Sequence, residues 1–148
     1  MEENIRIRVS GLFVENGKVL LVKHQKYGKE YYLLPGGGQD SGETAVDALK
    51  REWKEELDLS ITVGELLFSG ESVPKKDLNR RHVLQMVFKV TSTSGKINLV
   101  PDGPLVDYHW EDIGRLGDIT IYPQCLPQIK SALSGEETRK FETYVWTD

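Results

Sequence analysis

The most informative stretch of the chain is LPGGGQDSGE at residues 34–43, followed by REWKEELDL at residues 51–59. Three consecutive glycines after Pro35 predict a loop whose backbone can approach a ligand closely. A helix is predicted from Thr44 to Leu57, because Thr44 suits the N-cap and apolar residues then recur on one face. The residues of this apolar face are Val46, Leu49, Trp53 and Leu57.

Three carboxylates lie along one side of this predicted helix, because Glu52, Glu55 and Glu56 stand at positions i, i+3 and i+4. Like charges at about 4 Å repel by several kcal/mol at intermediate dielectric. Arg51 offers Glu55 one exposed partner, which is worth ~0.3–0.5 kcal/mol. A divalent cation would relieve the repulsion, and ligands that are all oxygen favour Mg²⁺ or Mn²⁺. The alternative is a solvated, glutamate-rich helix face.

The glycine loop favours the metal interpretation, because it places free backbone groups beside these carboxylates. A loop carbonyl can ligate a cation, and nearby N–H groups can meet phosphate. The loop and the helix together resemble the box of the Nudix hydrolase family. That pattern begins with a glycine, which is followed after five residues by a glutamate and after seven more by Arg-Glu; here these are Gly37, Glu43 and Arg51-Glu52. It continues with an aliphatic residue, any residue, two glutamates, any residue, a glycine and an aliphatic residue.

Two positions depart from that pattern. Trp53 replaces an aliphatic residue and Asp58 replaces the glycine. A glycine at the end of a helix commonly serves as a C-cap with positive φ, and Asp tolerates this conformation better than most residues. We therefore expect Asp58 to have a positive φ.

The resemblance implies a role for each matching residue. The metal ligands are expected to be the Gly36 carbonyl and the three helix carboxylates, and Glu52 or Glu56 would also polarise the attacking water. Arg51 would orient these groups and pair with Glu43. Family members hydrolyse a nucleoside diphosphate linked to another moiety: water attacks one phosphorus, and the metal neutralises the developing charge.

The substrate is expected to be ADP-ribose or another nucleotide sugar, because Pro74 follows Asp58 by sixteen residues, as in the ADP-ribose branch of the family. The alternative substrates are a dinucleoside polyphosphate or a (d)NTP. An alternative of another class is a non-catalytic, nucleotide-sensing module. The complete set of helix glutamates disfavours this last alternative.

Other residues are candidates for binding substrate. They are the backbone of Gly37 and Gly38, Arg81 before an apolar strand, and Asp102 in a loop that contains glycine and proline. Asp102 or Asp107 is a candidate general base, because relatives place an acidic group from this region near the metals. The candidates for stacking on a base are Tyr31, Tyr32 and Tyr122.

The rest of the chain predicts strands on both sides of the helix. Residues 5–9 alternate in polarity, residues 19–22 return after a turn at Asn16-Gly17, and residues 82–90 form a further apolar strand. A second helix is expected within residues 121–133. This order predicts an α/β (α+β) fold with an open sheet covered by helices on two sides. The resemblance specifies a Nudix-type α/β/α sandwich with a mixed central sheet, in one domain over residues 1–148 with a C-terminal extension at 134–148.

Composition limits the partners. The chain has 148 residues, a net charge of -4 and one cysteine, Cys125, so bulk nucleic acid, an internal disulfide and a multi-cysteine zinc site are not expected. No apolar run is long enough to span a membrane, and residues 1–10 do not resemble a secretory signal. A cytoplasmic location is therefore expected. A homodimer is predicted from the apolar residues of the extension, which are Phe141, Tyr144, Val145 and Trp146. The alternative is that these residues pack on the sheet of their own chain.

Overall fold

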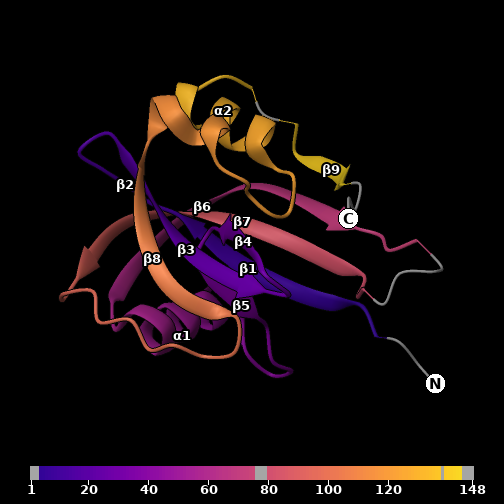
Figure 1. The fold of residues 1–148 in the computed structure, drawn as a ribbon, viewed down its shortest axis with the longest axis horizontal. Coiled ribbons are helices and arrows are strands. Elements are labelled where there is room, and N and C mark those ends of the chain that lie inside the picture. Colours follow the sequence, from indigo (N-terminus) through magenta and orange to yellow (C-terminus); the bar gives the residue numbers. More distant parts are fainter. Residues whose placement is uncertain (1–3, 76–79, 138, 145–148) are drawn as a thin grey trace.

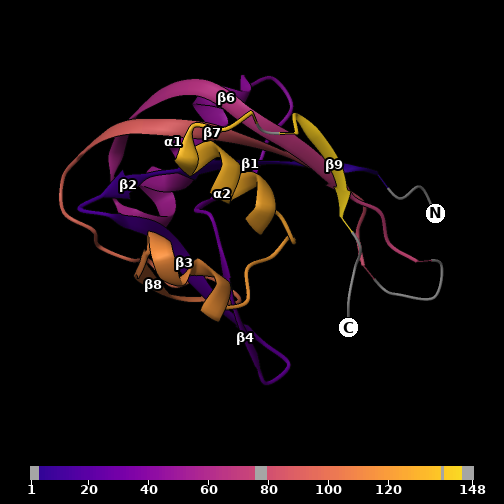
Figure 2. The same cartoon turned by 90° about the horizontal axis from the view of Figure 1, so that it is seen from above.

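Two β-sheets lie between two helices, with α1 on one face and α2 on the other (Figures 1 and 2). The computed structural model describes residues 4–75, 80–137 and 139–144. In chain order the elements are β1 (Arg6–Leu12), β2 (Val14–Glu15), β3 (Lys18–Lys26), β4 (Lys29–Leu33), β5 (Gly36–Gly38), α1 (Ala45–Leu57), β6 (Ser60–Ser72), β7 (Val83–Ser94), β8 (Leu105–Asp112), a 3₁₀ helix η1 (Ile113–Asp118), α2 (Leu126–Ser134) and β9 (Phe141–Tyr144).

The larger sheet is mixed and has the strand order β5-β1-β7-β6-β9. β1 runs parallel to β7 and β9 runs parallel to β6, whereas β5 and β1, and β6 and β7, are antiparallel. In the second sheet β3 pairs antiparallel with β2, β4 and β8. The expected mixed α+β fold is confirmed, and its strand layer is divided into two sheets.

The turn predicted at Asn16-Gly17 is present, and both residues have positive φ, 54° and 74°. It joins only β2 to β3, with Glu15 opposite Lys18. β1 leaves this hairpin and pairs instead with β5 and β7. The physical reason is that β1 is buried from Val9 onwards. A buried strand needs hydrogen-bonding neighbours along both of its edges.

Helix α1 begins and ends as its sequence predicts. The Thr44 hydroxyl accepts a hydrogen bond from the Asp47 amide at 3.0 Å, and Asp58 has a φ of 57°. The Trp53 Nε1 donates to the Pro35 carbonyl at 2.9 Å, which ties the helix to the start of β5. The buried face differs slightly from the prediction, since Val46 is only partly buried and Ala48 takes a place in the core.

Each helix packs on a separate hydrophobic cluster, and both clusters draw on both sheets. β3 shows this by alternation: Leu20 packs with Trp53 on the α1 side, whereas Leu21 packs with Ile129 on the α2 side. Burial of each such side chain contributes ~1.5–3 kcal/mol. This packing holds α1 firmly beside the glycine strand β5.

The second helix is shorter than predicted, because residues 121–125 precede it as irregular chain. Part of the expected extension at 134–148 forms β9, in which Tyr144 is buried and donates its hydroxyl proton to the Gln128 side-chain carbonyl. Phe141 is half exposed. Val145 and Trp146 lie outside the described residues. Within the described chain, no helix combines the length and hydropathy that crossing a membrane requires.

Candidate active site

The glycines of β5 are required by close neighbours. A Cβ at Gly36 would lie 1.9 Å from the Val9 carbonyl oxygen, and one at Gly37 would lie 2.3 Å from the Glu52 Cδ. The Glu52 carboxylate of α1 therefore rests directly against the Gly37 backbone. Gly37 stands opposite Val9 in the ladder, and the Gln39 amide donates to Ile7. Because ladder bonds alternate along the strand, the Gly36 carbonyl faces away from β1.

Arg51 organises the glutamates around this loop. It donates from Nε and Nη2 to the two oxygens of Glu43, at 3.1 and 2.6 Å, and from Nη2 to the Gly38 carbonyl at 2.9 Å. Its Nη1 donates to Glu52 at 2.9 Å and to Glu55 at 3.3 Å. The pairing of Arg51 with Glu43 predicted from the sequence is therefore present, and one guanidinium bridges the glycine loop to the helix.

Glu43 and Arg51 shift each other's proton affinity. The Arg51 guanidinium, helped by the Asp40 amide, lowers the pKa of Glu43 to about 2. Glu43 in turn is the main cause that raises the pKa of Arg51 above its usual value. Both groups are therefore charged at neutral pH. The bidentate geometry fixes their relative orientation.

Glu56 lies in a different environment from the other box glutamates. Burial raises its pKa to about 7, although the charge of Arg8 acts in the opposite direction. Its Oε2 is buried and has no hydrogen-bond partner among the described residues. An unpaired, buried carboxylate oxygen is costly. It therefore marks a place where a cation or water belongs.

The donor set fits a hard divalent cation. Glu56 offers its unpaired Oε2, the Gly36 carbonyl faces outward, and Glu52 keeps Oε2 outside its ion pair with Arg51. All these donors are oxygens, as Mg²⁺ prefers. The side chains do not form a ready-made cluster, because in the described ranges no three His, Cys, Asp or Glu residues converge as metal ligands. Glu55 is 58% exposed and pairs with Arg51, so the mutual repulsion expected from the sequence is partly relieved by Arg51.

The two candidate general bases lie in different surroundings. Asp102 exchanges backbone hydrogen bonds with Leu105, and its charge contributes to the raised pKa of Glu56. Asp107 accepts a hydrogen bond from the Tyr108 amide, and its charge acts on Lys23 instead. Of the two candidates, Asp102 is therefore the one whose charge acts on Glu56.

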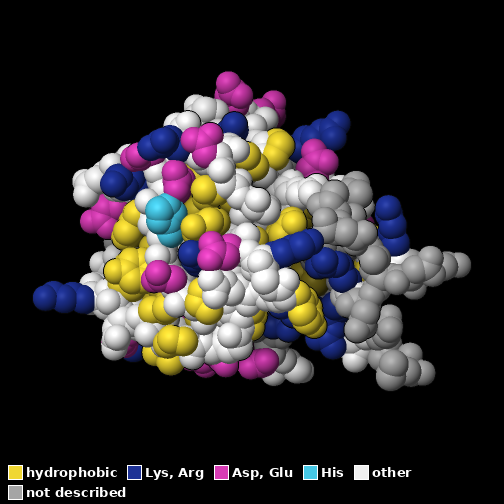
Figure 3. All heavy atoms as spheres, viewed as in Figure 1, with side chains coloured by type: hydrophobic (Ala, Val, Ile, Leu, Met, Phe, Trp, Pro, Cys, Tyr) yellow, Lys and Arg dark blue, Asp and Glu magenta, His cyan; other side chains and the backbone are white. Residues whose placement is uncertain are grey.

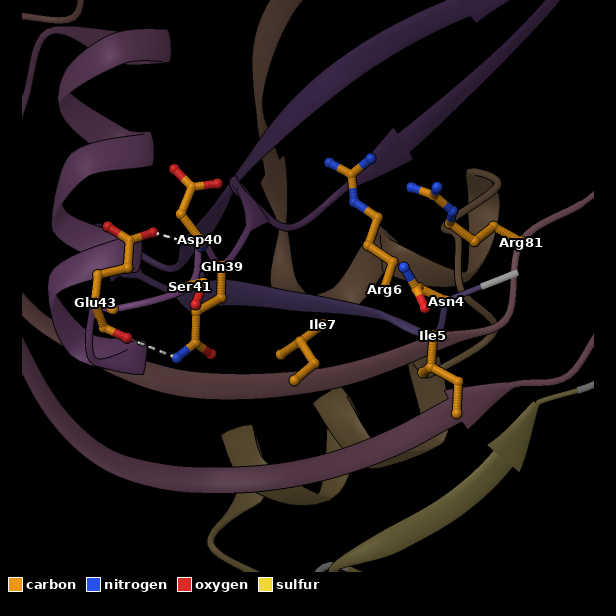
Figure 4. A pocket seen from close by; sticks show the side chains of 10 residues that line it. Asn4, Ile5, Arg6, Ile7, Gln39, Asp40, Ser41, Glu43 and Arg81 are labelled. Carbon is orange, nitrogen blue, oxygen red and sulfur yellow. Dashed lines mark hydrogen bonds between the residues drawn. The ribbon is translucent and has the colours of Figure 1, made fainter. Parts of the chain in front are cut away.

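Arg81 lines a cavity of about 460 Å³ at the N-terminal end of β1. Figure 4 shows Arg6 and Arg81 extending on one side, with Asp40 and Glu43 on the other. On the face drawn in Figure 3, lysine and arginine side chains gather over this end of the strands. The lining includes Glu43 and none of the three α1 glutamates. Arg81 therefore lies across this cavity from residues 39–43, which connect β5 to α1, rather than at Glu56.

Arg8 was not among the site residues expected from the sequence, although its charge acts on Glu56 and the charges of Glu56 and Glu52 act on it. The alternation of residues 5–9 predicted a half-buried strand and indicated no function for Arg8. The tyrosines are partly brought together: the Tyr31 ring lies 5.1 Å from Tyr122 and 5.5 Å from His24. Tyr32 contacts a different ring, that of His109.

Solved structures share this fold. The MutT protein of Bacillus halodurans superposes with a TM-score of 0.77 at 19% identity, covering 97% of this chain and 91% of that one. The MutT NUDIX hydrolase of Burkholderia pseudomallei has a TM-score of 0.73 at 22% identity, covering 86% and 98%. An ADP-ribose pyrophosphatase of Streptococcus suis has a TM-score of 0.62 at 18% identity, covering 97% and 100%. At these identities the likeness concerns the fold alone.

Sequence similarity extends the comparison to the family. The profile of the NUDIX domain matches residues 5–129. An ADP-ribose pyrophosphatase of Methanocaldococcus jannaschii is 33% identical over 103 residues, which are 69% of this chain and 60% of the relative's length. The matched region contains the glycine strand, Arg51 and the α1 glutamates whose geometry is described above. The chain therefore belongs to the Nudix family.

Proposed function

We propose that this protein is a divalent-metal-dependent pyrophosphohydrolase that cleaves ADP-ribose or another nucleotide sugar. The observation that carries the proposal is the buried, unpaired Oε2 of Glu56, on the helix whose Glu52 rests against Gly37. Buried carboxylates without partners persist where they bind something. Water attacks one phosphorus of the pyrophosphate in this reaction, and the products of ADP-ribose are AMP and ribose 5-phosphate.

Each residue of the site has a proposed task. Glu52, Glu55, Glu56 and the Gly36 carbonyl hold Mg²⁺ or Mn²⁺, which supplies charge neutralisation for the reacting phosphates. Glu56 orients the attacking water. Arg51 keeps Glu52 and Glu55 in place while Glu43 fixes its guanidinium. The Gly38 amide, which faces away from β1 by the same alternation as the Gly36 carbonyl, is proposed to meet a phosphate oxygen, whereas the Gly37 amide faces β1.

Asp102 is proposed as the general base in preference to Asp107. The support is electrostatic: the charge of Asp102 reaches Glu56, whereas that of Asp107 acts on Lys23. An exposed carboxylate near the metal ligands can accept the proton of the attacking water. Asp102→Asn should therefore lower kcat more than Asp107→Asn does.

The relative from Methanocaldococcus jannaschii supports ADP-ribose as the substrate, because it is an ADP-ribose pyrophosphatase. The chain spans 60% of that relative's length, so the substrate is inferred from the shared part alone. Pro74, at the position that resembles the ADP-ribose branch, follows the end of β6. Arg81, which lies across its cavity from residues 39–43, is proposed to contact the moiety beyond the pyrophosphate.

A panel of substrates tests this proposal. ADP-ribose, a second nucleotide sugar, a dinucleoside polyphosphate and a dNTP are each incubated with the protein and Mg²⁺, and separately with excess chelator. We expect AMP from ADP-ribose at the highest kcat/KM, and no hydrolysis with chelator. A preference for the dNTP or the polyphosphate would reassign the substrate. Nucleotide binding without any hydrolysis would favour the sensing module.

The homodimer and the cytoplasmic location stay proposals. The half-exposed Phe141 of β9 supports the dimer, whereas Tyr144 is buried within its own chain. Sedimentation of the full chain against Phe141→Glu tests the dimer, because this change leaves Tyr144 in place. Dissociation of a wild-type dimer by the substitution would support the interface. A monomeric wild type would exclude it.

A further inference from the structure

Arg8 is a cation in the middle of β1 that faces away from α1. A Cβ at Gly11 would lie 3.0 Å from Trp53, so Gly11 faces the helix. Side chains alternate along a strand, so Arg8 points to the opposite face of the sheet. Its neighbours across the two ladders are Gly38 on β5 and Gln85 on β7. A Cβ at Gly38 would lie 3.0 Å from Nη2 of Arg6, so a second guanidinium covers Gly38 on the same face of the sheet as Arg8.

Most of the hydrogen-bonding capacity of Arg8 is unused. Nη2 donates to the Leu34 carbonyl at 2.7 Å, whereas the buried Nε has no partner among the residues that the structure describes. A guanidinium carries five N–H donors, and an unpaired buried donor on a cation is costly. The hydroxyl of Ser10, on the same face two residues along, is also buried without a described partner. Of these two polar side chains, Ser10 is fully buried and Arg8 is only partly buried, so Arg8 is the one that a ligand can reach.

The surroundings of Arg8 indicate which polar groups these are. Burial lowers the pKa of Arg8, and the charges of Glu56 and Glu52 act against that shift without forming an ion pair with it. On another side lies Tyr31, whose pKa is raised by burial and lowered by the charges of Arg80 and Arg8. A diphosphate with an attached ring system matches this combination of a cation, proposed metal ligands and aromatic rings.

We propose that Arg8 is a substrate-binding residue that donates its Nε–H and a terminal N–H to phosphate oxygens of a nucleoside diphosphate. The pyrophosphate then lies at the sheet edge formed by β5, where Arg8 approaches from the face away from α1 and the carboxylates of Glu52 and Glu56 approach from α1. The nucleoside is directed towards the rings of Tyr31 and Tyr122. This inference deepens the proposed function and rests on it for the reaction, but it concerns nucleotide binding, which is measurable without turnover.

Binding of ADP in excess EDTA tests the proposal. Calorimetry compares the wild type with Arg8→Gln and with Arg8→Lys, which keeps the charge and loses the planar fork. Arg115→Gln is the matched control, because Arg115 is an exposed arginine paired with Asp118. We expect ADP binding to weaken by about tenfold or more in both Arg8 variants and to be unchanged in the control. Equal affinities for wild type and Arg8→Gln, or no ADP binding by the wild type, would overturn the proposal.

A second measurement needs no variant, which matters if loss of Arg8 unfolds the chain. A crystal structure of the wild type with α,β-methylene ADP-ribose should show a phosphate oxygen within hydrogen-bonding distance of Arg8 Nε. A diphosphate that is held only by other groups would contradict the proposal. Hydrolysis assays separate the two claims. A wild type that binds ADP through Arg8 but cleaves nothing refutes the proposed function alone, whereas one that cleaves ADP-ribose with no contribution from Arg8 refutes this inference alone.

Discussion

Substitution of Gly37 by alanine should disable the site while leaving the fold intact. The added Cβ would lie 2.3, 2.4 and 2.6 Å from Cδ, Oε2 and Oε1 of Glu52. Carbon atoms in contact require about 3.5 Å or more. The carboxylate must therefore move by roughly 1 Å or more, away from the glycine strand. The φ of Gly37 is not positive, so alanine adds no backbone strain there.

The expected magnitude follows from that displacement. A shift of about 1 Å in a catalytic group can cost ~100-fold in rate, which corresponds to ~2.7 kcal/mol of activation free energy. The free energy of unfolding should change by less than about 1 kcal/mol. Alanine in place of glycine restricts the unfolded chain and so favours the folded state. This gain offsets part of the stability that is lost when the contact between Glu52 and Arg51 weakens.

The assay measures kcat and the Mg²⁺ dependence of ADP-ribose hydrolysis, together with urea unfolding. Gly114→Ala is the matched control, because a Cβ there has no heavy atom within 4 Å. Gly36→Ala is the contrasting variant, since its Cβ would strike the Val9 carbonyl and should destabilise the β1–β5 pairing. A Gly37→Ala protein with wild-type kcat and Mg²⁺ dependence would refute the reasoning about Glu52.

Two further results are expected. Asp58→Gly should raise the free energy of unfolding by roughly 0.5–1 kcal/mol, because glycine adopts the left-handed backbone at φ 57° without strain. The substitution loses only the exposed ion pair of Asp58 with Lys54. An unchanged urea midpoint would count against this prediction. The ion pair of Glu43 and Arg51 should make the stability of the fold depend on pH, because the pKa of Glu43 in the folded state, about 2, lies below its unfolded value. The stabilisation by this pair is complete above about pH 4.5 and is lost as the pH falls towards 2. Melting temperatures of wild type and Glu43→Gln should therefore converge at low pH, and a constant difference between them would contradict this.

Local signals explain why the α1 region could be predicted from the sequence. The two ends of the helix, at Thr44 and Asp58, depend on residues only a few positions away in the sequence. The pairing of Arg51 with Glu43 likewise joins residues that are close in the sequence. The charge distribution was harder to predict. The sequence places three glutamates on one side of the helix, but only the structure shows that Arg51 binds two of them and that Glu56 is left buried.

Long-range pairing explains what the sequence did not predict. The alternation of residues 5–9 identifies a strand, yet it does not tell which sheet β1 joins, and the hairpin at Asn16 suggested the wrong partner. β9 pairs with β6, a segment about seventy residues earlier, through contacts that no local pattern encodes. The surroundings of Arg8 could not be predicted for the same reason. Its partners, Gly38 and Gln85, are distant in sequence.

The most direct test of the central claim is the turnover of Glu56→Gln. The claim is that the buried carboxylate of Glu56 serves metal-dependent hydrolysis, and glutamine keeps its size while removing its charge. With saturating ADP-ribose and Mg²⁺, we predict a kcat lower by roughly 100-fold or more, since loss of an electrostatic group in phosphoryl chemistry costs ~3 kcal/mol. The melting temperature should be at least that of the wild type, because a buried unpaired charge is removed. A near-wild-type kcat in a folded Glu56→Gln protein would contradict the account.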